Sequence, residues 1–328
     1  MKSVSATGSK TTSRTKAPAN AETENETVST TTTQMPIVTG KSKKAPKKAV
    51  TSSPVICTNT PIPNFVPPQN TLMYFTLSST SALRAIFDAL KELPPSISLT
   101  VTEGGLKMIN DLDPKCILVV DIPVEDLGAF YIKEQLSLGL RTARFSQVIR
   151  TIHAKDPVVM YVLAEDPTNL YINIINTSTE FSRTIILPLL AMQAGAMSLT
   201  LPEFVSKCKI PTIRIQKMLK DTMSLGGDKV TIIKTPGHLR MDSMIADYRQ
   251  EIKYVVEDSV CNTQAVIEGR YNVSPIKAFI KSIALSQHIN VMMSPSLPLV
   301  FEYNFAQKSS FSIIITDVRD IRTLDKLK

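Results

Sequence analysis

The chain is poor in the residues that most metal sites and many enzyme sites require. It has three histidines and four cysteines among 328 residues, and no two cysteines show CxxC spacing. We therefore expect neither a disulfide framework nor a zinc site, and this cysteine usage fits a reducing intracellular compartment. His153, His238 and His288 are scattered without metal-ligand spacing, so the sequence predicts no metal and no cofactor.

Long hydrophobic runs and catalytic motifs are also missing. No apolar stretch reaches the roughly 18 residues needed to cross a bilayer, and the first residues lack an apolar signal-peptide core, so we expect no membrane association. The pairs Gly104–Gly105 and Gly226–Gly227 are not followed by Lys-Ser/Thr, and we interpret both as turns rather than phosphate-binding loops. No nucleophile elbow or acid–base pair is present, which predicts that the protein is not an enzyme.

The charge that is present is unevenly distributed. Of the net charge of +8, residues 1–70 carry nine Lys/Arg and three Glu (+6), and the remainder carries 28 basic and 26 acidic residues (+2). Residues 1–69 are rich in Ser, Thr, Lys, Ala and Pro, so we predict a disordered basic tail. The lysine cluster at 41–48 indicates nuclear localisation or nucleic-acid contact, or else a solubilising tail.

Four segments repeat the pattern of an amphipathic helix, with apolar residues at i, i+3 and i+4. The four apolar triplets are Leu83-Ile86-Phe87, Phe145-Val148-Ile149, Ile215-Met218-Leu219 and Ile276-Phe279-Ile280. The first and third copies lie 132 residues apart (215 − 83), and the second and fourth 131 (276 − 145). The sequence therefore predicts an α+β fold of two similar domains, each with two helices packed on antiparallel sheets.

The pattern also predicts where each part begins and ends. The expected helices are Ala82–Leu93, Thr142–Ile152, Thr212–Thr222 and Ser274–Ile283. The expected parts are a tail over 1–69, a first domain over 70–187, a connector over 188–202, a second domain over 203–317 and a C-terminal tail over 318–328.

Each predicted helix carries cations on the face opposite its apolar stripe. These cations are Arg84, Lys91, Arg144, Arg150, Lys217, Lys220, Lys277 and Lys281. Lysine and arginine bind phosphates without reading base sequence, and the lack of an aromatic stacking surface favours a duplex over single strands. We therefore predict a surface that binds double-stranded DNA independently of its sequence.

Three stretches carry a resemblance to a known family, the eukaryotic-type DNA sliding clamps of the proliferating cell nuclear antigen (PCNA) group. Residues 81–91 resemble the first clamp helix, and residues 215–221 the helix that opens the second domain. Residues 297–303, Leu-Pro-Leu-Val-Phe-Glu-Tyr, resemble the penultimate strand. The resemblance covers residues 71–317 and is that of a divergent member.

The resemblance implies a head-to-tail trimeric ring of the clamp fold, with the helices lining a hole through which duplex DNA passes. It implies a DNA polymerase processivity factor that tethers polymerase and other replication or repair proteins, is opened by a clamp loader, and self-associates as a homotrimer. The eight cations would line the hole, with Arg144 compensating for Gln147 at a position where the family has a cation. The implied location is the nucleus, or the viral replication compartment if the protein is virally encoded.

The resemblance also implies two protein-binding sites. The last strand of the first domain, near 180–187, would pair with the edge near 250–256 of the next subunit. The candidate interface residues are Phe181, Arg183, Ile185, Ile252, Tyr254 and Val256. A pocket for partner peptides would form around the connector, with candidates Leu112, Leu189, Leu190, Met192, Pro298, Ile314 and Ile315.

Two other functions stay open at this point. The same fold serves as a regulatory clamp, either a late transcription factor or a checkpoint-type subunit of a heterotrimer. A monomeric DNA-binding subunit of a polymerase is the other alternative. Oligomeric state and partner identity separate these three functions.

Overall fold

The computed structural model describes residues 55–58, 66–90, 94–113, 115–176, 181–191, 199–245, 247–262 and 264–319. The described residues belong to one compact unit. All pairings between its strands are antiparallel across the described residues. Two predicted site residues, Lys91 and Met192, and the lysine cluster at 41–48 lie outside the described residues.

The first sheet contains six strands in the order β1-β6-β2-β8-β9-β10. They are β1 (Val55–Thr58), β2 (Thr71–Leu77), β6 (Ala129–Ile132), β8 (Val158–Leu163), β9 (Asn169–Asn176) and β10 (Phe181–Pro188). β1 lies at one edge of this sheet and β10 at the other.

The central sheet contains nine strands in the order β15-β11-β17-β18-β19-β5-β4-β3-β7. They are β3 (Ser96–Thr102), β4 (Gly105–Asp113), β5 (Cys116–Pro123), β7 (Leu136–Arg141), β11 (Ser206–Pro211), β15 (Glu257–Cys261), β17 (His288–Met293), β18 (Leu299–Asn304) and β19 (Ser310–Ile315). β5 pairs with β19 from Cys116↔Ile315 to Asp121↔Ser310. The two halves of the chain therefore share one continuous sheet.

The third sheet contains four strands in the order β14-β13-β12-β16. They are β12 (Lys229–Thr235), β13 (His238–Ile245), β14 (Tyr248–Val255) and β16 (Ile267–Asn272). The turn at Pro236–Gly237 joins β12 to β13, and Gly237 adopts the positive φ of 67° that glycine accommodates without strain. β14 forms one edge of this sheet.

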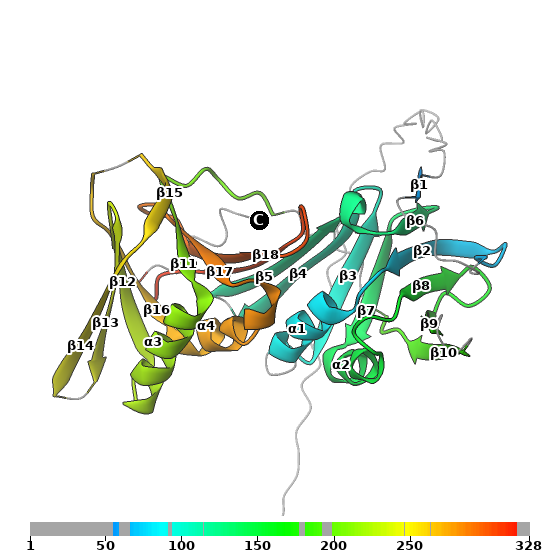
Figure 1. Ribbon diagram of the computed structural model, residues 1–328, viewed down its shortest axis with the longest axis horizontal. Coiled ribbons are helices and arrows are strands. Elements are labelled where there is room, and N and C mark those ends of the chain that lie inside the picture. Colours follow the sequence, from blue (N-terminus) through cyan, green and yellow to red (C-terminus); the bar gives the residue numbers. More distant parts are fainter. Residues whose placement is uncertain are drawn as a thin grey trace, which may run out of the picture. The chain divides into compact units, whose positions relative to one another are not determined.

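Four α-helices and two short 3₁₀ turns complete the described structure. The helices are α1 (Ser81–Leu90), α2 (Thr142–Thr151), α3 (Thr212–Ser224) and α4 (Val273–Ile280), and the 3₁₀ turns are η1 (Val124–Asp126) and η2 (Ile283–Leu285). α1 contacts both α2 and α4, and α4 contacts α3, so the helices form one layer in the order α2-α1-α4-α3. Figure 1 shows this layer along the lower side of the view, with the central sheet above it and strands of the other two sheets at its two ends.

The helices form where the apolar triplets predict, because those triplets become part of the core. Leu83, Ile86 and Phe87 of α1 are at most 7% exposed. The ring of Phe87 packs 4.5 Å from that of Phe145 on α2, which fixes these two helices against each other. The predicted α+β arrangement, with helices on one side of antiparallel sheets, is confirmed.

Several elements differ from the sequence prediction, among them two strands and the end of α4. The structure places β1 inside the segment expected to be disordered, so that expectation does not hold over Val55–Thr58. It adds β15 (Glu257–Cys261), which pairs with β11. α4 ends at Ile280 rather than Ile283, and just beyond this end the buried hydroxyl of Ser282 donates to the carbonyl of Ala85 in α1.

Candidate nucleic-acid interface

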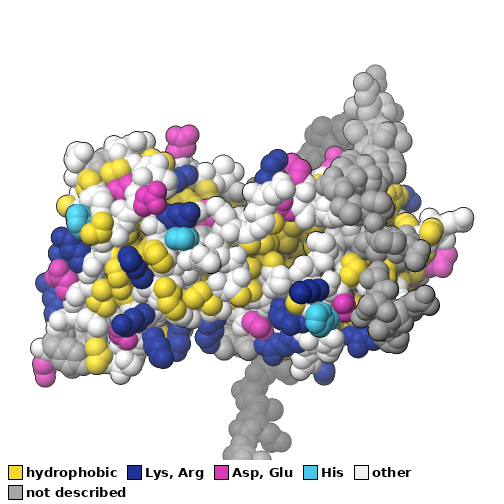
Figure 2. All heavy atoms as spheres, in the orientation of Figure 1, with side chains coloured by type: hydrophobic (Ala, Val, Ile, Leu, Met, Phe, Trp, Pro, Cys, Tyr) yellow, Lys and Arg dark blue, Asp and Glu magenta, His cyan; other side chains and the backbone are white. Residues whose placement is uncertain are grey.

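The layer of four helices carries a strong excess of positive charge. Eight cations lie on the helices or at the residue that ends α4, namely Arg84, Arg144, Arg150, Arg214, Lys217, Lys220, Lys277 and Lys281. The same segments contain two carboxylates, Asp88 and Asp221, which leaves an excess of six positive charges (8 − 2). Figure 2 shows Lys and Arg gathered along the lower side of the molecule, where Figure 1 places the helices.

In the first helix pair, α1 and α2, these cations bond to other parts of the protein. The guanidinium of Arg84 donates to the carbonyl oxygens of Ile152 and Arg150 at the end of α2. These carbonyls have no partner within their own helix, and a nearby arginine also favours the negative end of the helix dipole. Arg150 in turn donates through Nε to Asp88 at 2.8 Å. Arg84, predicted to bind DNA, therefore links two helices.

In the second helix pair, α3 and α4, the cations face solvent. Lys217, Lys220 and Lys277 are exposed, and no hydrogen bond or ion pair engages their side chains within the described part of the chain. Lys281 is exposed just beyond α4. The three lysines on the helices can reach phosphate oxygens without breaking a bond inside the protein.

Arg214 on α3 was missed by the sequence prediction. It is exposed one turn before Lys217, and its guanidinium lies 5.9 Å from the ring centroid of Tyr254 on β14. The spacing of three residues from Lys217 placed it on the same helix face and was the signal that could have identified it.

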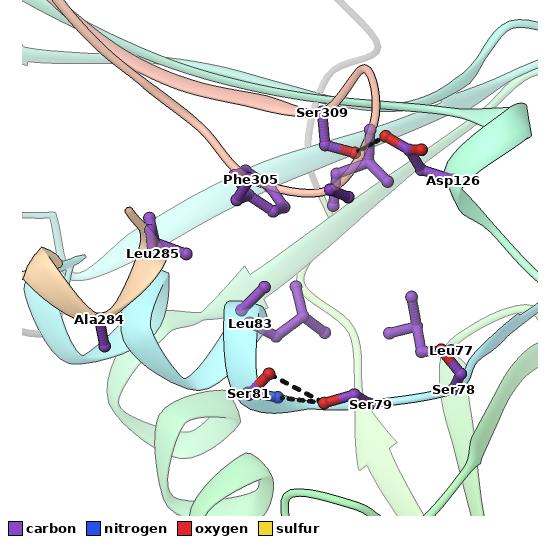
Figure 3. A pocket seen from close by; sticks show the side chains of 13 residues that line it. Leu77, Ser78, Ser79, Ser81, Leu83, Asp126, Ala284, Leu285, Phe305 and Ser309 are labelled. Carbon is purple, nitrogen blue, oxygen red and sulfur yellow. Dashed lines mark hydrogen bonds between the residues drawn. The ribbon is translucent and has the colours of Figure 1, made fainter. Parts of the chain in front are cut away.

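A hollow of about 290 Å³ lies beside the start of α1, between α1, η2 and the turn from β18 to β19. Figure 3 shows Asp126 on its rim, bonded to Ser309. The same carboxylate accepts hydrogen bonds from the backbone amides of Gln307 and Lys308 at 3.2 and 2.8 Å. Asp126 therefore ties the first half of the chain to the second, which is a structural role.

Two observations on the described residues concern metal binding and thiol chemistry. No group of three or more His, Cys, Asp or Glu among them lies close enough to hold a metal ion. Burial raises the pKa of the Cys208 thiol to about 12, so this cysteine is protonated at neutral pH and unreactive. Among the described helices, none combines the length and the apolar character that crossing a membrane requires.

The two strands predicted to meet between subunits both lie at sheet edges. β10 pairs only with β9, and β14 only with β13, in the described sheets. Of the predicted interface side chains, Ile185, Ile252 and Tyr254 are half-buried against the core and Val256 is buried. The guanidinium of Arg183 donates to the hydroxyl of Thr151 at 2.8 Å, and the side chain of Phe181 lies outside what the structure describes.

A second apolar cluster lies on the face of the central sheet opposite the main core. It consists of Ile117, Val119, Phe204, Met292, Val300 and Ile314, with Ile109, Leu199, Leu201 and Leu297 half-buried against it. Successive residues of a strand face opposite sides, so Ile313 and Ile315 enter the main core while Ile314 enters this cluster. The half-buried leucines offer apolar surface at its margin.

The predicted peptide pocket is only partly assembled in this arrangement. Ile315 faces the main core, so its side chain is not available to a docked peptide, and Pro298 and Ile314 are buried. Half-buried Leu112 and Leu189 pack against the main core instead. Half-buried Leu190 is held at β7, where its amide donates to the carbonyl of Gly139 at 2.8 Å. The leucines that surround the second cluster, which the sequence prediction missed, are Leu199, Leu201 and Leu297.

The layer of four helices on antiparallel sheets is an arrangement that this chain shares with known proteins. Residues 72–195 match the family described as "Proliferating cell nuclear antigen, N-terminal domain". The chain is 19% identical over 259 residues to the "Probable DNA polymerase sliding clamp 1" of Paramecium bursaria Chlorella virus 1, covering 76% of this chain and 98% of that protein. It is 23% identical over 235 residues to the "DNA polymerase sliding clamp 3" of Sulfurisphaera tokodaii, covering 69% and 91%.

Solved structures show the same fold. The proliferating cellular nuclear antigen of Entamoeba histolytica superposes with a TM-score of 0.68 at 13% identity, covering 75% of this chain and 99% of that one. A chain of the PCNA2–PCNA3 complex of Sulfolobus tokodaii gives a TM-score of 0.65 at 19% identity, covering 75% and 100%. The chain therefore has the fold of these clamp structures, and its residues 72–195 match the N-terminal domain of proliferating cell nuclear antigen.

Proposed function

We propose that the protein is a DNA polymerase processivity factor, a sliding clamp that encircles duplex DNA and tethers polymerase and other replication or repair proteins to it. The observation that carries this proposal is the single layer of four helices with an excess of six positive charges. The relatives named as DNA polymerase sliding clamps support it. In this role the protein has no catalytic activity of its own.

Sliding follows from the kind of interaction that the helices offer. Lysine and arginine side chains attract phosphates at any sequence, and the attraction is screened over a Debye length of about 8 Å at physiological salt. Each phosphate is therefore held weakly and exchanged quickly, which lets a ring move along the duplex. Retention comes from encirclement, so tight binding is not required.

The proposed ring is a head-to-tail homotrimer in which β10 of one subunit pairs with β14 of the next. Each of these edge strands is eight residues long. An open edge carries unpaired backbone groups, which a second strand satisfies. Ile186 on β10, Met244 on β13 and Val255 on β14 are 55%, 65% and 73% exposed, and assembly would cover them.

The proposed partners dock at the second apolar cluster. Leu199, Leu201 and Leu297 at its margin provide a surface for short peptides of DNA polymerase and other clamp-binding proteins. Opening of the ring requires a clamp loader. We place the protein in the nucleus, or in a viral replication compartment if it is virally encoded, where its partners act.

The solution mass of the full chain, measured by light scattering across a dilution series, tests this assembly. The proposal predicts a species near 108.3 kDa, three times the chain mass of 36.1 kDa. A mass of 36.1 kDa at every concentration, without further association when duplex DNA is added, would contradict it.

A further inference from the structure

The strand β1 extends the first sheet from the N-terminal side of the region that matches the clamp family. Its four residues pair with β6 from Val55↔Ile132 to Thr58↔Ala129. Among the described elements, β6 is the one with which β1 makes extensive contact. Figure 1 shows β1 at the upper end of this sheet, on the side away from the helix layer. One short ladder therefore joins β1 to the described part of this sheet.

The sequence explains why β1 is both extended and short. Val55, Ile56 and Thr58 are β-branched, and such residues favour strands. Pro54 and Pro61 lie on either side, and proline has no N–H to donate to a ladder. The sequence therefore favours a short extended peptide between the two prolines.

The partner strand β6 is held by the rest of the fold and does not depend on β1. Ala129, Phe130 and Ile132 are at most 9% exposed. At the ends of β6, the amide of Gly128 donates to the carbonyl of Thr76 at 3.0 Å, and the amide of Lys133 to that of Leu72 at 2.9 Å. Release of β1 would therefore leave β6 in position, with one edge of its backbone open.

We propose that this edge of β6 is a strand-addition site for an extended, β-branched segment of a partner protein, and that β1 occupies it as an exchangeable strand of the chain itself. Main-chain hydrogen bonds supply most of the affinity in such sites. A four-residue strand at the edge of a sheet opens locally at low cost. The site goes beyond the proposed clamp function and offers a partner a position on the side away from the helix layer.

Hydrogen exchange of the full chain, followed by mass spectrometry, tests whether β1 covers this edge. The informative variant is Ile56→Pro/Cys57→Pro. Neighbouring residues of a strand point their N–H groups in opposite directions, so one of the two substituted residues donates to β6. Because proline has no N–H, the double substitution removes at least one hydrogen-bond donor from the ladder between β1 and β6. We expect faster exchange of the β6 amides with unchanged exchange of β8 and β9. The matched control, Ser52→Pro/Ser53→Pro, adds the same prolines before β1 and should exchange like the wild type.

Addition of a synthetic peptide of residues 52–60 tests whether the edge accepts a strand from outside. A tethered strand acts at millimolar effective concentration, so the peptide is added at about 1 mM. It should restore protection of β6 in the Ile56→Pro/Cys57→Pro chain, whereas the same peptide with both prolines should not. If the β6 amides exchange equally fast in the wild type and the variant, the proposal that β1 covers this edge is wrong. If the peptide does not restore protection of the β6 amides, the proposal of a strand-addition site is wrong.

Discussion

The two halves of the chain repeat the same helix pattern but use their charges differently. In the first half, Arg84 and Arg150 connect α1 to α2, and the ion pair between Arg150 and Asp88 is exposed, with 44% and 39% of the side chains accessible. In the second half, the cations of α3 and α4 face solvent. The ion pair of this half that should contribute most to stability is buried and joins two strands. There Lys234 lies 2.8 Å from Asp258, with 2% and 16% of their side chains accessible.

This difference teaches that cations on the same layer of helices do not have equal roles. A cation that bonds to a neighbouring helix must break that bond before it binds a phosphate, whereas a solvated lysine gives up only water. We therefore expect DNA binding to rest mainly on α3 and α4, and the cations of α1 and α2 to contribute more to stability. Each of the following predictions tests one part of this contrast.

The largest effect should come from the buried ion pair of the second half. Asp258→Ala leaves Lys234 buried and uncompensated, which should lower the free energy of unfolding by about 3–5 kcal/mol. The matched change in the first half, Asp88→Ala, removes one partner of an exposed pair and should cost less than about 1 kcal/mol. Urea unfolding of the two variants measures both losses in the free energy of unfolding. Equal losses would contradict the expected difference between the buried and the exposed ion pair.

The next effect concerns DNA. Lys217→Ala/Lys220→Ala/Lys277→Ala should weaken duplex binding and lower the slope of log K against log salt by about 0.9 for each phosphate that is no longer neutralised. The matched variant of the first pair is Arg84→Met/Arg144→Ala/Arg150→Ala, which removes the same charge. Fluorescence anisotropy over a salt series should show the smaller change for that variant. An equal or greater weakening there would contradict the assignment of DNA binding to α3 and α4.

A smaller effect is expected from Arg84 alone. Arg84→Met keeps the apolar stem of the side chain but removes the donors to the carbonyls that end α2, which should cost about 1 kcal/mol. This cost should appear as a lower midpoint of thermal unfolding, with DNA binding close to that of the wild type. The opposite outcome, unchanged stability with weaker DNA binding, would indicate that Arg84 binds DNA, as the sequence predicts.

The smallest effect is the pH dependence of the junction between the halves. Burial opposes ionisation of Asp126, but hydrogen bonds from Ser309, Lys308 and Gln307 outweigh it and hold the pKa of this carboxyl below its usual range. The stabilisation is therefore complete above the unfolded-state pKa and is lost as pH falls through the folded-state pKa. Asp126→Asn should be less stable than wild type at pH 7, and the difference should shrink in strong acid. A difference that is constant with pH would contradict the role of the charge.

Much of the fold could be predicted because the signals are local. The apolar triplets fix four helices, and the glycine of the Pro236–Gly237 turn marks a hairpin. The strands β1 and β15 could not be predicted, because each is short, lies in a polar segment and forms only by pairing with a strand far away in sequence. Just beyond the end of α4, the hydroxyl of Ser282 likewise donates to the carbonyl of Ala85, 197 residues away.

For the candidate sites, the sequence predicted the types of residue present but not the contacts that each residue makes. The sequence places cations opposite each apolar stripe, yet it cannot show that Arg84 reaches the carbonyls of the neighbouring helix. The run Ile313-Ile314-Ile315 indicates a strand that is buried on both faces. The sequence does not show which of these faces packs against Phe204, because that contact joins segments far apart in the chain. The pocket prediction therefore named Ile315, whose side chain faces the main core.

Encirclement of DNA is the central claim, and topology tests it most directly. The full chain is incubated with nicked circular duplex DNA, its subunits are joined with an amine-reactive cross-linker, and the sample is treated with SDS before and after the DNA is cut once. The account predicts protein that stays on the circle in SDS and leaves it when the circle is cut. Cross-linked trimers that SDS removes from the intact circle, or that remain on the cut DNA, would contradict it.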